Sequence, residues 1–211
     1  MEIFSRYSGE GKFRRRIENS EGHNQTLNTN FMSEWLSRTE LLLGKEGVEK
    51  LKRAHVLVAG LGGVGAYAAE QLCRAGVGEM TLIDGDVTEV TNKNRQLLAL
   101  DSMLGQPKAD LMARRCRDIH PEIKLHIIND FIRDEQMIDV LKAAPYDYVV
   151  DAIDTLAPKI FLIYHSVHLG LPVVSSMGSG GKLDPSKIEV ADISKSCLLY
   201  TSPSPRDTER S

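Results

Sequence analysis

A glycine-rich loop is the first stretch whose residue types and spacing could do chemistry: Gly60-Leu-Gly-Gly-Val-Gly65 follows the short apolar run His55–Ala59. Between a buried strand and a helix, such a loop lets the backbone approach phosphates closely, and the helix N-terminus adds free N–H groups and a positive dipole. Asp84 ends the next apolar run, where an acid can bond ribose hydroxyls. The pattern predicts a nucleotide site, and its alternative is a packing turn that needs small residues. On these features alone, a nicotinamide dehydrogenase would be favoured.

Two cations in the following segment argue against a nicotinamide cofactor. Arg95 lies in the loop Asn92-Lys-Asn-Arg-Gln96, and Lys108 stands in the first turn of the helix expected to begin near Pro107. A cation at a helix N-terminus is unfavourable by about 0.3–1 kcal/mol, and a bound polyanion is one good reason to tolerate it. Arg95 and Lys108 would neutralise a triphosphate better than the two phosphates of NAD. The alternative is that both charges face solvent.

Two carboxylates, Asp151 and Asp154, follow the later apolar run Tyr146–Val150. Ligands of open α/β sheets bind at the carboxyl ends of the strands, which is where these acids would stand. Paired carboxylates can hold a magnesium ion that bridges to phosphate oxygens. The alternative is that Asp154 caps the helix that begins after Thr155, which is compatible with metal binding.

A fold must bring these residues together at one edge of a sheet, and the order of the apolar segments indicates which fold it is. The expected strands are His55–Ala59, Glu79–Ile83, Lys124–Ile128, Tyr146–Val150 and Pro172–Ser175. The expected helices run from Ala66 to about Ala75, from near Pro107, over about Glu135–Ala143 and over about Pro158–Leu169. Strands that alternate with helices indicate a parallel sheet covered on both faces. We therefore expect an α/β fold with a Rossmann-like, doubly wound, mostly parallel sheet.

The composition is that of an ordinary globular chain. Of the 211 residues, 42% are hydrophobic and 26% charged, and the formal net charge of −3 gives no global sign of nucleic acid or membrane. Cys73, Cys116 and Cys197 have no CxxC spacing, which excludes a disulfide framework and a four-cysteine zinc site within this chain. No apolar run approaches the length of a membrane span, and no signal peptide opens the chain. We expect a cytoplasmic enzyme or binding domain, with Cys73 and Cys116 packed in its core.

The two ends differ from the middle. Residues 1–31 show no apolar periodicity, so we expect a disordered or non-native leader, with Met32 as the natural start. The cluster Arg14–Arg16 fits a solvated charge run better than a nucleic-acid arm. Residues 197–211 break the α/β pattern, and one back-translation of this tail resembles a sequencing-library adapter, so we expect an artefact there. The domain is then expected at residues 32–196, incomplete at its C-terminus.

Six motifs stand in order along the middle of the chain. They are Arg38, GLGGVG at 60–65, DGD at 84–86, NKNRQ at 92–96, GQPKA at 105–109 and DAID at 151–154. Together they resemble the ThiF/MoeB/HesA family of ATP-dependent adenylating enzymes, which are relatives of the ubiquitin-activating enzymes. The resemblance covers nearly all of residues 36–196 and implies that residues 32–196 form an ATP-binding adenylating domain. Such an enzyme uses ATP and Mg²⁺ to activate a carboxylate, and this step needs no side-chain nucleophile.

The resemblance implies an ATP-binding set of residues. Gly63 and Asp84 would bind the phosphate and ribose ends of ATP, and polar residues of the loop 92–96 would line the phosphates. The expected set is Gly60, Gly62, Gly63, Gly65, Asp84, Asp86, Asn92, Arg95, Gln96 and Lys108.

The resemblance also implies a catalytic set, made up of Arg38, Arg95, Lys108 and Asp154. Lys108 would stabilise the charge on the transferring phosphate, and Asp154 would bind Mg²⁺, with Asp151 as a further candidate ligand. Arg38 corresponds to an arginine that, in dimeric members, reaches into the partner's site. We therefore expect a homodimer for the full-length protein.

Two branches of the family differ in the carboxylate that they activate. One activates the C-terminal glycine of a small ubiquitin-like sulfur carrier. The other, the tRNA threonylcarbamoyladenosine dehydratases, adenylates the threonyl carboxylate of a modified tRNA base and cyclises it to an oxazolone. Thr155 stands where sulfur-carrier enzymes commonly have Asn, and the stretch Val173–Ile188, followed by VADISKS, closely resembles the dehydratase branch. The resemblance therefore favours the dehydratase, with tRNA carrying threonylcarbamoyladenosine as the partner.

Two alternatives stay open. A sulfur-carrier activator predicts pyrophosphate release with a Gly-Gly-ended protein and indifference to tRNA, whereas a non-catalytic nucleotide-binding scaffold predicts ATP binding without exchange. A sulfur-transfer or cysteine desulfurase system is left open as a further partner. In the family, much of the substrate surface lies beyond this stretch, so the 211-residue form can lack activity, and its acidic balance shows no basic face for tRNA.

Overall fold

The computed structural model describes residues 35–133, 135–178 and 183–193, so the expected leader at 1–31 and the expected artefact at 197–211 lie outside the described residues. The chain divides into two compact units, Met1–Val48 and Glu49–Ser211. Helix α2 (Ser37–Arg53) begins in the first unit and is broken at Gly44, whose φ of 72° lies in the left-handed region that glycine tolerates. Arg38 belongs to the first unit, whereas every other predicted site residue belongs to the second.

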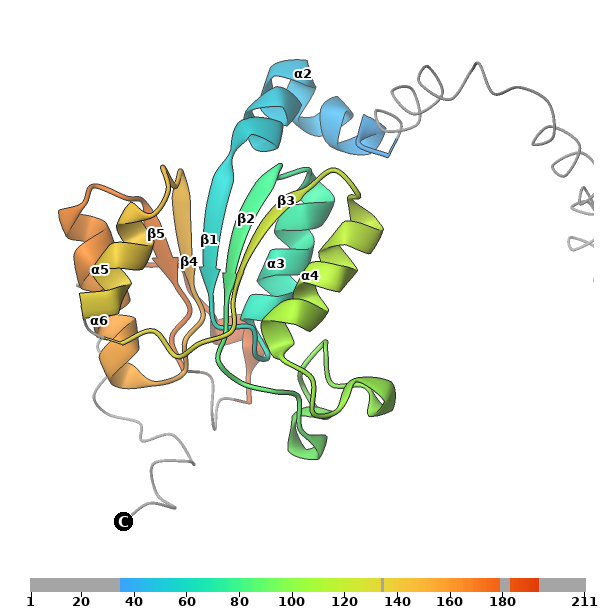
Figure 1. Ribbon diagram of the computed structural model, residues 1–211. Helices are drawn as coiled ribbons and strands as arrows, with labels where there is room; N and C mark the ends of the chain where they lie inside the picture. Colours follow the sequence, from blue (N-terminus) through green and yellow to red (C-terminus); the bar gives the residue numbers. More distant parts are fainter. Residues whose placement is uncertain (1–34, 134, 179–182, 194–211) are drawn as a thin grey trace, which may run out of the picture. The chain divides into compact units, whose positions relative to one another are not determined.

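The second unit is built on a five-stranded parallel sheet in the order β3-β2-β1-β4-β5 (Figure 1). The strands are β1 (His55–Ala59), β2 (Glu79–Ile83), β3 (Lys124–Ile128), β4 (Tyr148–Asp151) and β5 (Val173–Ser175). The helices are α3 (Gly65–Ala75), α4 (Lys108–Ile119), α5 (Glu135–Lys142) and α6 (Leu156–His168), with short 3₁₀ turns at Val90–Asn92, Asp101–Met103 and Pro185–Lys187. The α/β, Rossmann-like, doubly wound sheet expected from the alternating pattern is confirmed.

The helices lie where the sequence predicts them, with small shifts at their ends. Helix α6 begins at Leu156 rather than at Pro158, because proline is tolerated in the first turn of a helix, where its missing N–H costs no hydrogen bond. Helix α4 begins at Lys108, directly behind Pro107. Among the described residues, every helix is too short or too polar to cross a bilayer.

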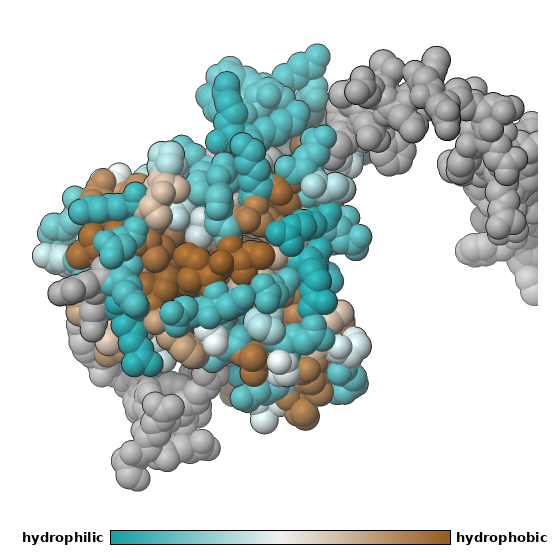
Figure 2. All heavy atoms as spheres, viewed as in Figure 1, coloured by the Kyte–Doolittle hydropathy of each residue, from teal (hydrophilic) through white to brown (hydrophobic). Residues whose placement is uncertain are grey.

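Each face of the sheet is covered by one pair of helices, because the central strands are apolar on both faces. Val58 packs with Cys73 of α3 and Cys116 of α4, and Leu57 packs in a second cluster with Leu162 of α6. Figure 1 shows α3 and α4 on one side of the sheet and α5 and α6 on the other. In Figure 2, apolar atoms gather across the middle of this view and polar residues surround them. The predicted packing role of Cys73 and Cys116 is confirmed, since both thiols are buried.

The strand order fixes where a ligand can bind. The chain leaves β1 toward β2 on one side and returns to β4 on the other, so the crossover direction reverses between β1 and β4. In open α/β sheets, ligands bind at such a switch point, in the crevice at the carboxyl ends of the strands. The loops that follow β1, β2 and β4 all start from this edge, and the predicted site residues of the second unit lie in these loops or directly beside them.

Candidate functional site

Two of the four loop glycines are required by the turn itself. Gly60 has a φ of 85°, and a Cβ there would lie 2.7 Å from the carbonyl oxygen of Ala152. A Cβ on Gly65 would lie 1.7 Å from the carbonyl oxygen of Gly60. No backbone can absorb an overlap of that size without moving, so these two glycines allow β1, α3 and the loop after β4 to pack closely. Packing alone therefore explains why Gly60 and Gly65 are glycines.

The other two glycines are not required by packing. A Cβ on Gly62 would have only Gln96 Nε2 within 4 Å, at 3.8 Å, and a Cβ on Gly63 would lie 3.6 Å from Arg95 Cγ. These are ordinary van der Waals distances, so the fold would tolerate a side chain at either position. The cradle over Gly62 and Gly63 therefore leaves room for a ligand to approach the backbone, as a phosphate site requires.

Gln96 supplies an unpaired acceptor beside this cradle. Its side chain is 9% exposed, and its Oε1 has no hydrogen-bond partner in the described part of the chain. A buried polar atom without a partner costs about 1–3 kcal/mol, so a ligand that donates a hydrogen bond there would be favoured. The Nε2 of the same amide faces Gly62. Gln96 thus points at the space that the glycines leave open.

Asn92 has a structural task that the sequence did not reveal. Its Oδ1 accepts a hydrogen bond of 3.1 Å from the backbone N–H of Glu89, and the Glu89 side chain accepts one from the Asn92 N–H. This reciprocal capping closes the 3₁₀ turn Val90–Asn92. The side chain is 8% exposed and holds the loop that carries Arg95 and Gln96.

Arg95 keeps an exposed guanidinium next to the cradle. Its Nη1 donates to the carbonyl oxygen of Thr91 at 3.1 Å and to Asn94 Oδ1 at 2.8 Å. Both acceptors are neutral, so neither of these bonds neutralises the positive charge. The side chain crosses Gly63, which places a cation beside the open part of the loop.

The Asp84 carboxylate connects the loop that follows β1 with the loop that follows β2. Its Oδ2 accepts the N–H of Leu61 at 2.6 Å, and its Oδ1 accepts the N–H of Asp86 at 2.8 Å. Burial raises the pKa of Asp84 above its usual value, and the neighbouring Lys108 works in the opposite direction. Each carboxylate oxygen can still accept further hydrogen bonds. Asp84 therefore orders the glycine loop and keeps acceptor capacity for ribose hydroxyls.

Lys108 is buried, whereas one alternative expected it to face solvent. It is 4% exposed, its Nζ forms a 2.8 Å ion pair with Asp86 Oδ2, and its backbone N–H donates to the Asp86 carbonyl at 3.0 Å. The cation at the start of α4 is thus compensated by a carboxylate within the chain. The Asp86 side chain is 55% exposed, so water can solvate it if Lys108 turns to another anion.

Asp151 and Asp154, which were expected as a carboxylate pair at a metal, differ in burial and in hydrogen bonding. Asp151 is fully buried: its Oδ2 accepts from Lys159 Nζ at 2.6 Å and from Ser175 Oγ at 2.5 Å, and its Oδ1 accepts from the N–H of Ile153 at 3.0 Å. Asp154 is exposed, and the N-cap residue of α6 is Thr155. The carboxylate on the solvent side is therefore Asp154.

Lys159 is a residue that sequence reasoning missed. It is 5% exposed, and besides Asp151 it donates to Ser175 Oγ at 3.1 Å and to the carbonyl oxygen of Ser176 at 2.9 Å. A lysine in the largely apolar stretch LAPKIFLI was the available signal. Its three bonds join β4, β5 and α6 at the carboxyl edge of the sheet.

Comparisons with known sequences were consistent with this geometry. The ThiF family model matches residues 36–210. A tRNA threonylcarbamoyladenosine dehydratase of Bacillus subtilis is 47% identical over 159 residues, which make up 75% of this chain and 62% of that protein. An Escherichia coli protein of the same name is 41% identical over 157 residues, or 74% of this chain and 58% of that protein. The chain thus spans about three fifths of the length of these curated relatives.

A solved structure shares the fold. The crystal structure of the Escherichia coli tRNA N6-threonylcarbamoyladenosine dehydratase in complex with ATP matches with a TM-score of 0.76 and 40% sequence identity. The match covers 78% of this chain and 67% of that chain.

Proposed function

The chain belongs to the ThiF family, and from that premise we propose that it is the nucleotide-binding part of an ATP-dependent tRNA threonylcarbamoyladenosine dehydratase. The open cradle at Gly62 and Gly63, faced by the amide Nε2 of Gln96 and the exposed cation of Arg95, carries the nucleotide part of this proposal. The similarity to two dehydratases at 47% and 41% identity supports the choice of substrate.

ATP would lie along the carboxyl edge of the sheet. Its phosphates would lie over the N–H groups of Gly62 and Gly63, at the N-terminus of α3. Arg95 would contact the phosphates from the loop 92–96, and Asp84 would accept hydrogen bonds from the ribose hydroxyls. Asn92 would act on ATP only through the loop that it caps, since its Oδ1 is bound to backbone.

Lys108 would change partners when ATP binds. Its Nζ would move from Asp86 to a phosphate oxygen, and Asp86 would stay hydrated because its side chain is exposed. A buried ammonium beside the transferring phosphate stabilises the negative charge that grows during the attack, and the chain holds this charge in place beforehand. Asp86 therefore keeps Lys108 in position in the free protein.

Magnesium fits this site through one acid. Asp154 offers an exposed carboxylate after β4, and carboxylate oxygens suit Mg²⁺, which usually keeps several waters and bridges to phosphates. When bound, the ion would neutralise part of the phosphate charge. Asp151 would take no part, because both of its oxygens serve hydrogen bonds inside the fold.

The proposed reaction has two steps. A carboxylate oxygen of the threonyl group attacks the α-phosphorus of ATP, and the bond to the bridging oxygen breaks, which gives an acyl-adenylate and pyrophosphate. The carbamoyl oxygen then attacks the activated carbonyl carbon, AMP leaves, and a proton from the nitrogen goes to solvent. The oxazolone that forms has lost one water relative to the substrate, and that oxygen departs in AMP.

The partners follow from the same proposal. The tRNA substrate would place the enzyme in the cytoplasm. Arg38 would reach the site of the partner in a homodimer, as in dimeric members of the family. A sulfur-transfer or cysteine desulfurase partner stays a prediction.

Pyrophosphate release from ATP tests the function. We would compare three conditions with the same purified chain: tRNA carrying threonylcarbamoyladenosine, the same tRNA without the modification, and a Gly-Gly-ended ubiquitin-like protein. Release that requires the modified tRNA supports the dehydratase. Pyrophosphate release that requires the Gly-Gly protein and is independent of tRNA would mean that the chain activates a sulfur carrier and is not a dehydratase. Because the chain spans about three fifths of its relatives' length, ATP binding without release under any condition would show that this stretch alone binds the nucleotide without catalysis.

A further inference from the structure

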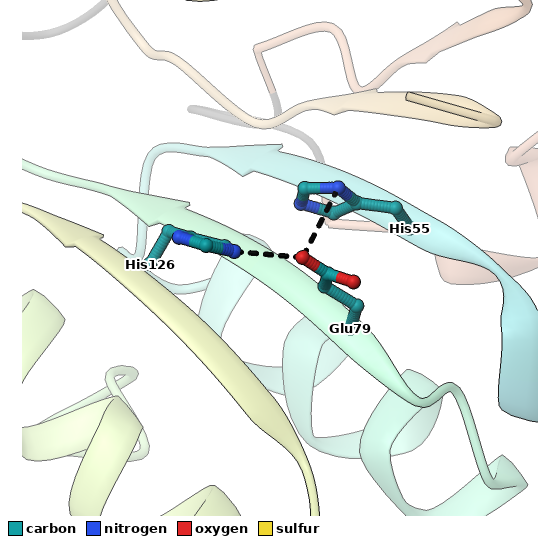
Figure 3. A group of neighbouring side chains, drawn as sticks. All are labelled: His55, Glu79 and His126. Carbon is teal, nitrogen blue, oxygen red and sulfur yellow. Dashed lines mark hydrogen bonds and ion pairs between the residues drawn. The ribbon is translucent and has the colours of Figure 1, made fainter. Parts of the chain in front are cut away.

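Three side chains that the nucleotide site does not use gather at the opposite edge of the sheet. His55 opens β1, Glu79 opens β2, and His126 is the third residue of β3 (Figure 3). His55 is paired with Glu79 in register, and His126 is paired with Thr81, so all three point to the same face. The glycine loop follows the last residue of β1, Ala59, so the cluster lies at the amino edge and the nucleotide site at the carboxyl edge.

Their ligand atoms are close enough to share one ion. His126 Nε2 lies 2.8 Å from Glu79 Oε1, and His55 Nδ1 lies 3.6 Å from the same oxygen. All of the donor atoms lie within 4.8 Å of one another. Ligand atoms on a tetrahedral zinc ion, at Zn–N and Zn–O distances of about 2.0–2.1 Å, lie roughly 3.4 Å apart. We propose that His55, Glu79 and His126 form a binding site for a first-row divalent transition-metal ion such as Zn²⁺.

The surroundings of His55 prepare its Nδ1 as a ligand. Its Nε2 lies 2.9 Å from Thr81 Oγ1, and the tautomer in which Nε2–H donates to that hydroxyl leaves a lone pair on Nδ1. Metal-bound histidines commonly use their second ring nitrogen in this way, which fixes the ring. The ring also packs 4.6 Å from that of Tyr146, centroid to centroid. Burial lowers the pKa of His55, so the ring is neutral at neutral pH, which is the form that binds metals.

His126 is the ligand that gives access. Its side chain is 55% exposed, whereas that of His55 is 6% exposed, so an ion would enter from the side of β3. The hydrogen bond from His126 lowers the pKa of Glu79, which keeps the carboxylate charged. Binding would put the metal in the place of the hydrogen between His126 Nε2 and Glu79 Oε1, and the neutral His126 ring would then carry its one proton on Nδ1. Three protein ligands would leave a fourth position for water.

Such an ion would join three neighbouring strands where they begin. Binding to the folded chain alone would raise its melting temperature by roughly 5–10 °C at a zinc concentration about 100 times the Kd. The alternative is that Glu79 only pairs with His126. An ion pair of that kind needs no metal and gives no zinc-dependent change.

The test titrates ZnCl₂ into the 211-residue chain by calorimetry, with the melting temperature recorded in parallel. His126→Asn is the main variant, because an exposed side chain can be changed with little risk to the fold. His168→Asn is the matched control, since His168 is also exposed and its Nδ1 bonds only to its own helix, at the carbonyl oxygen of Tyr164. We expect one zinc per chain for the wild type and the control, and at least about tenfold weaker binding for His126→Asn and Glu79→Gln.

Cobalt gives a second readout that a structural effect would not imitate. Co²⁺ bound by two imidazoles, one carboxylate and water should show the visible absorption of a four-coordinate ion, and His126→Asn should lose it. Equal zinc affinity in the wild type and His126→Asn would overturn the proposal, because the metal would then be bound elsewhere, as would an absence of zinc binding by the wild type. None of these readouts depends on ATP or tRNA, so the proposed function can fail without this site failing.

Discussion

Two buried lysines at the carboxyl edge of the sheet differ in how far their aspartate partners are exposed to solvent. Lys108 and Lys159 are 4% and 5% exposed, and each forms an ion pair with an aspartate. The side chain of Asp86, the partner of Lys108, is 55% exposed, whereas that of Asp151, the partner of Lys159, is 0% exposed. Lys108 can therefore leave its partner to water, and Lys159 cannot. The exposure of the acid decides which lysine is free to meet a ligand.

The largest effect is expected where neither partner can reach water. Lys159→Met should lower the free energy of unfolding by about 3–5 kcal/mol, because it leaves the Asp151 carboxylate buried without its cation. Urea unfolding followed by circular dichroism measures the change. Lys93→Met is the matched control: its partner Asp101 has an 85% exposed side chain, so the loss should be less than about 1 kcal/mol. Equal losses in the two variants would remove the distinction between buried and exposed acids.

The second effect falls on chemistry rather than on stability. In the full-length protein, Lys108→Ala should slow pyrophosphate release by at least about 100-fold, which is the scale of losing one group that stabilises transition-state charge. Its free energy of unfolding should fall less than that of Lys159→Met, because Asp86 stays hydrated. Near-normal release in Lys108→Ala would refute its assigned role and leave Lys108 as a structural partner of Asp86.

The third effect concerns ATP binding. Asp84→Ala removes the acceptor proposed for the ribose, and loss of hydrogen bonds to a charged group should weaken ATP binding by roughly tenfold or more. Calorimetric titration with ATP gives the Kd. Because the Leu61 N–H also loses its acceptor, the melting temperature must be recorded to separate loop disorder from lost contacts. An unchanged Kd would exclude Asp84 from the ribose site.

The buried Glu70, held by two arginines, gives the smallest effect and a pH dependence. Glu70 is 7% exposed and is held by Arg115 at 2.5 Å and Arg74 at 2.7 Å, whose side chains are 40% and 49% exposed. The hydrogen bond from Arg115 lowers the pKa of Glu70 below its ordinary value of 4.5. The stabilisation is therefore present above pH 4.5 and is lost as the pH falls through the lowered pKa.

Glu70→Gln should accordingly lower the free energy of unfolding by about 1 kcal/mol at neutral pH. The difference from the wild type should shrink as the pH falls below 4.5, since the wild-type carboxyl is then protonated as well. Urea unfolding at a series of pH values measures this. A difference that stays constant across the series would mean that Glu70 acts through packing and not through its charge.

The sequence predicted the frame well because the frame depends on local patterns. Apolar runs such as His55–Ala59 become strands, and Pro107 marks the start of α4. It did not predict which glycines the turn needs, because the contact between Gly65 and the Gly60 carbonyl exists only in the closed loop. The motif gives all four glycines the same weight, whereas the structure divides them into two pairs.

The hydrogen-bond partners of the acidic residues could not be predicted either, because these contacts also form only in the folded chain. Asp151 meets Lys159 across the β4–α6 connection and Ser175 on the neighbouring strand, so the pairing requires the register of the sheet. His55, Glu79 and His126 come together only when β1, β2 and β3 align. Spacing along the chain suggested a carboxylate pair at Asp151 and Asp154, and the burial of Asp151 separates the two.

A crystal structure of the chain with ATP and Mg²⁺ would show whether Lys108 exchanges Asp86 for a phosphate. We expect phosphates over Gly62 and Gly63, with Lys108 Nζ within hydrogen-bond distance of a phosphate oxygen and the Lys159–Asp151 pair unchanged. ATP bound elsewhere, or bound with Lys108 still paired only to Asp86, would contradict this expectation.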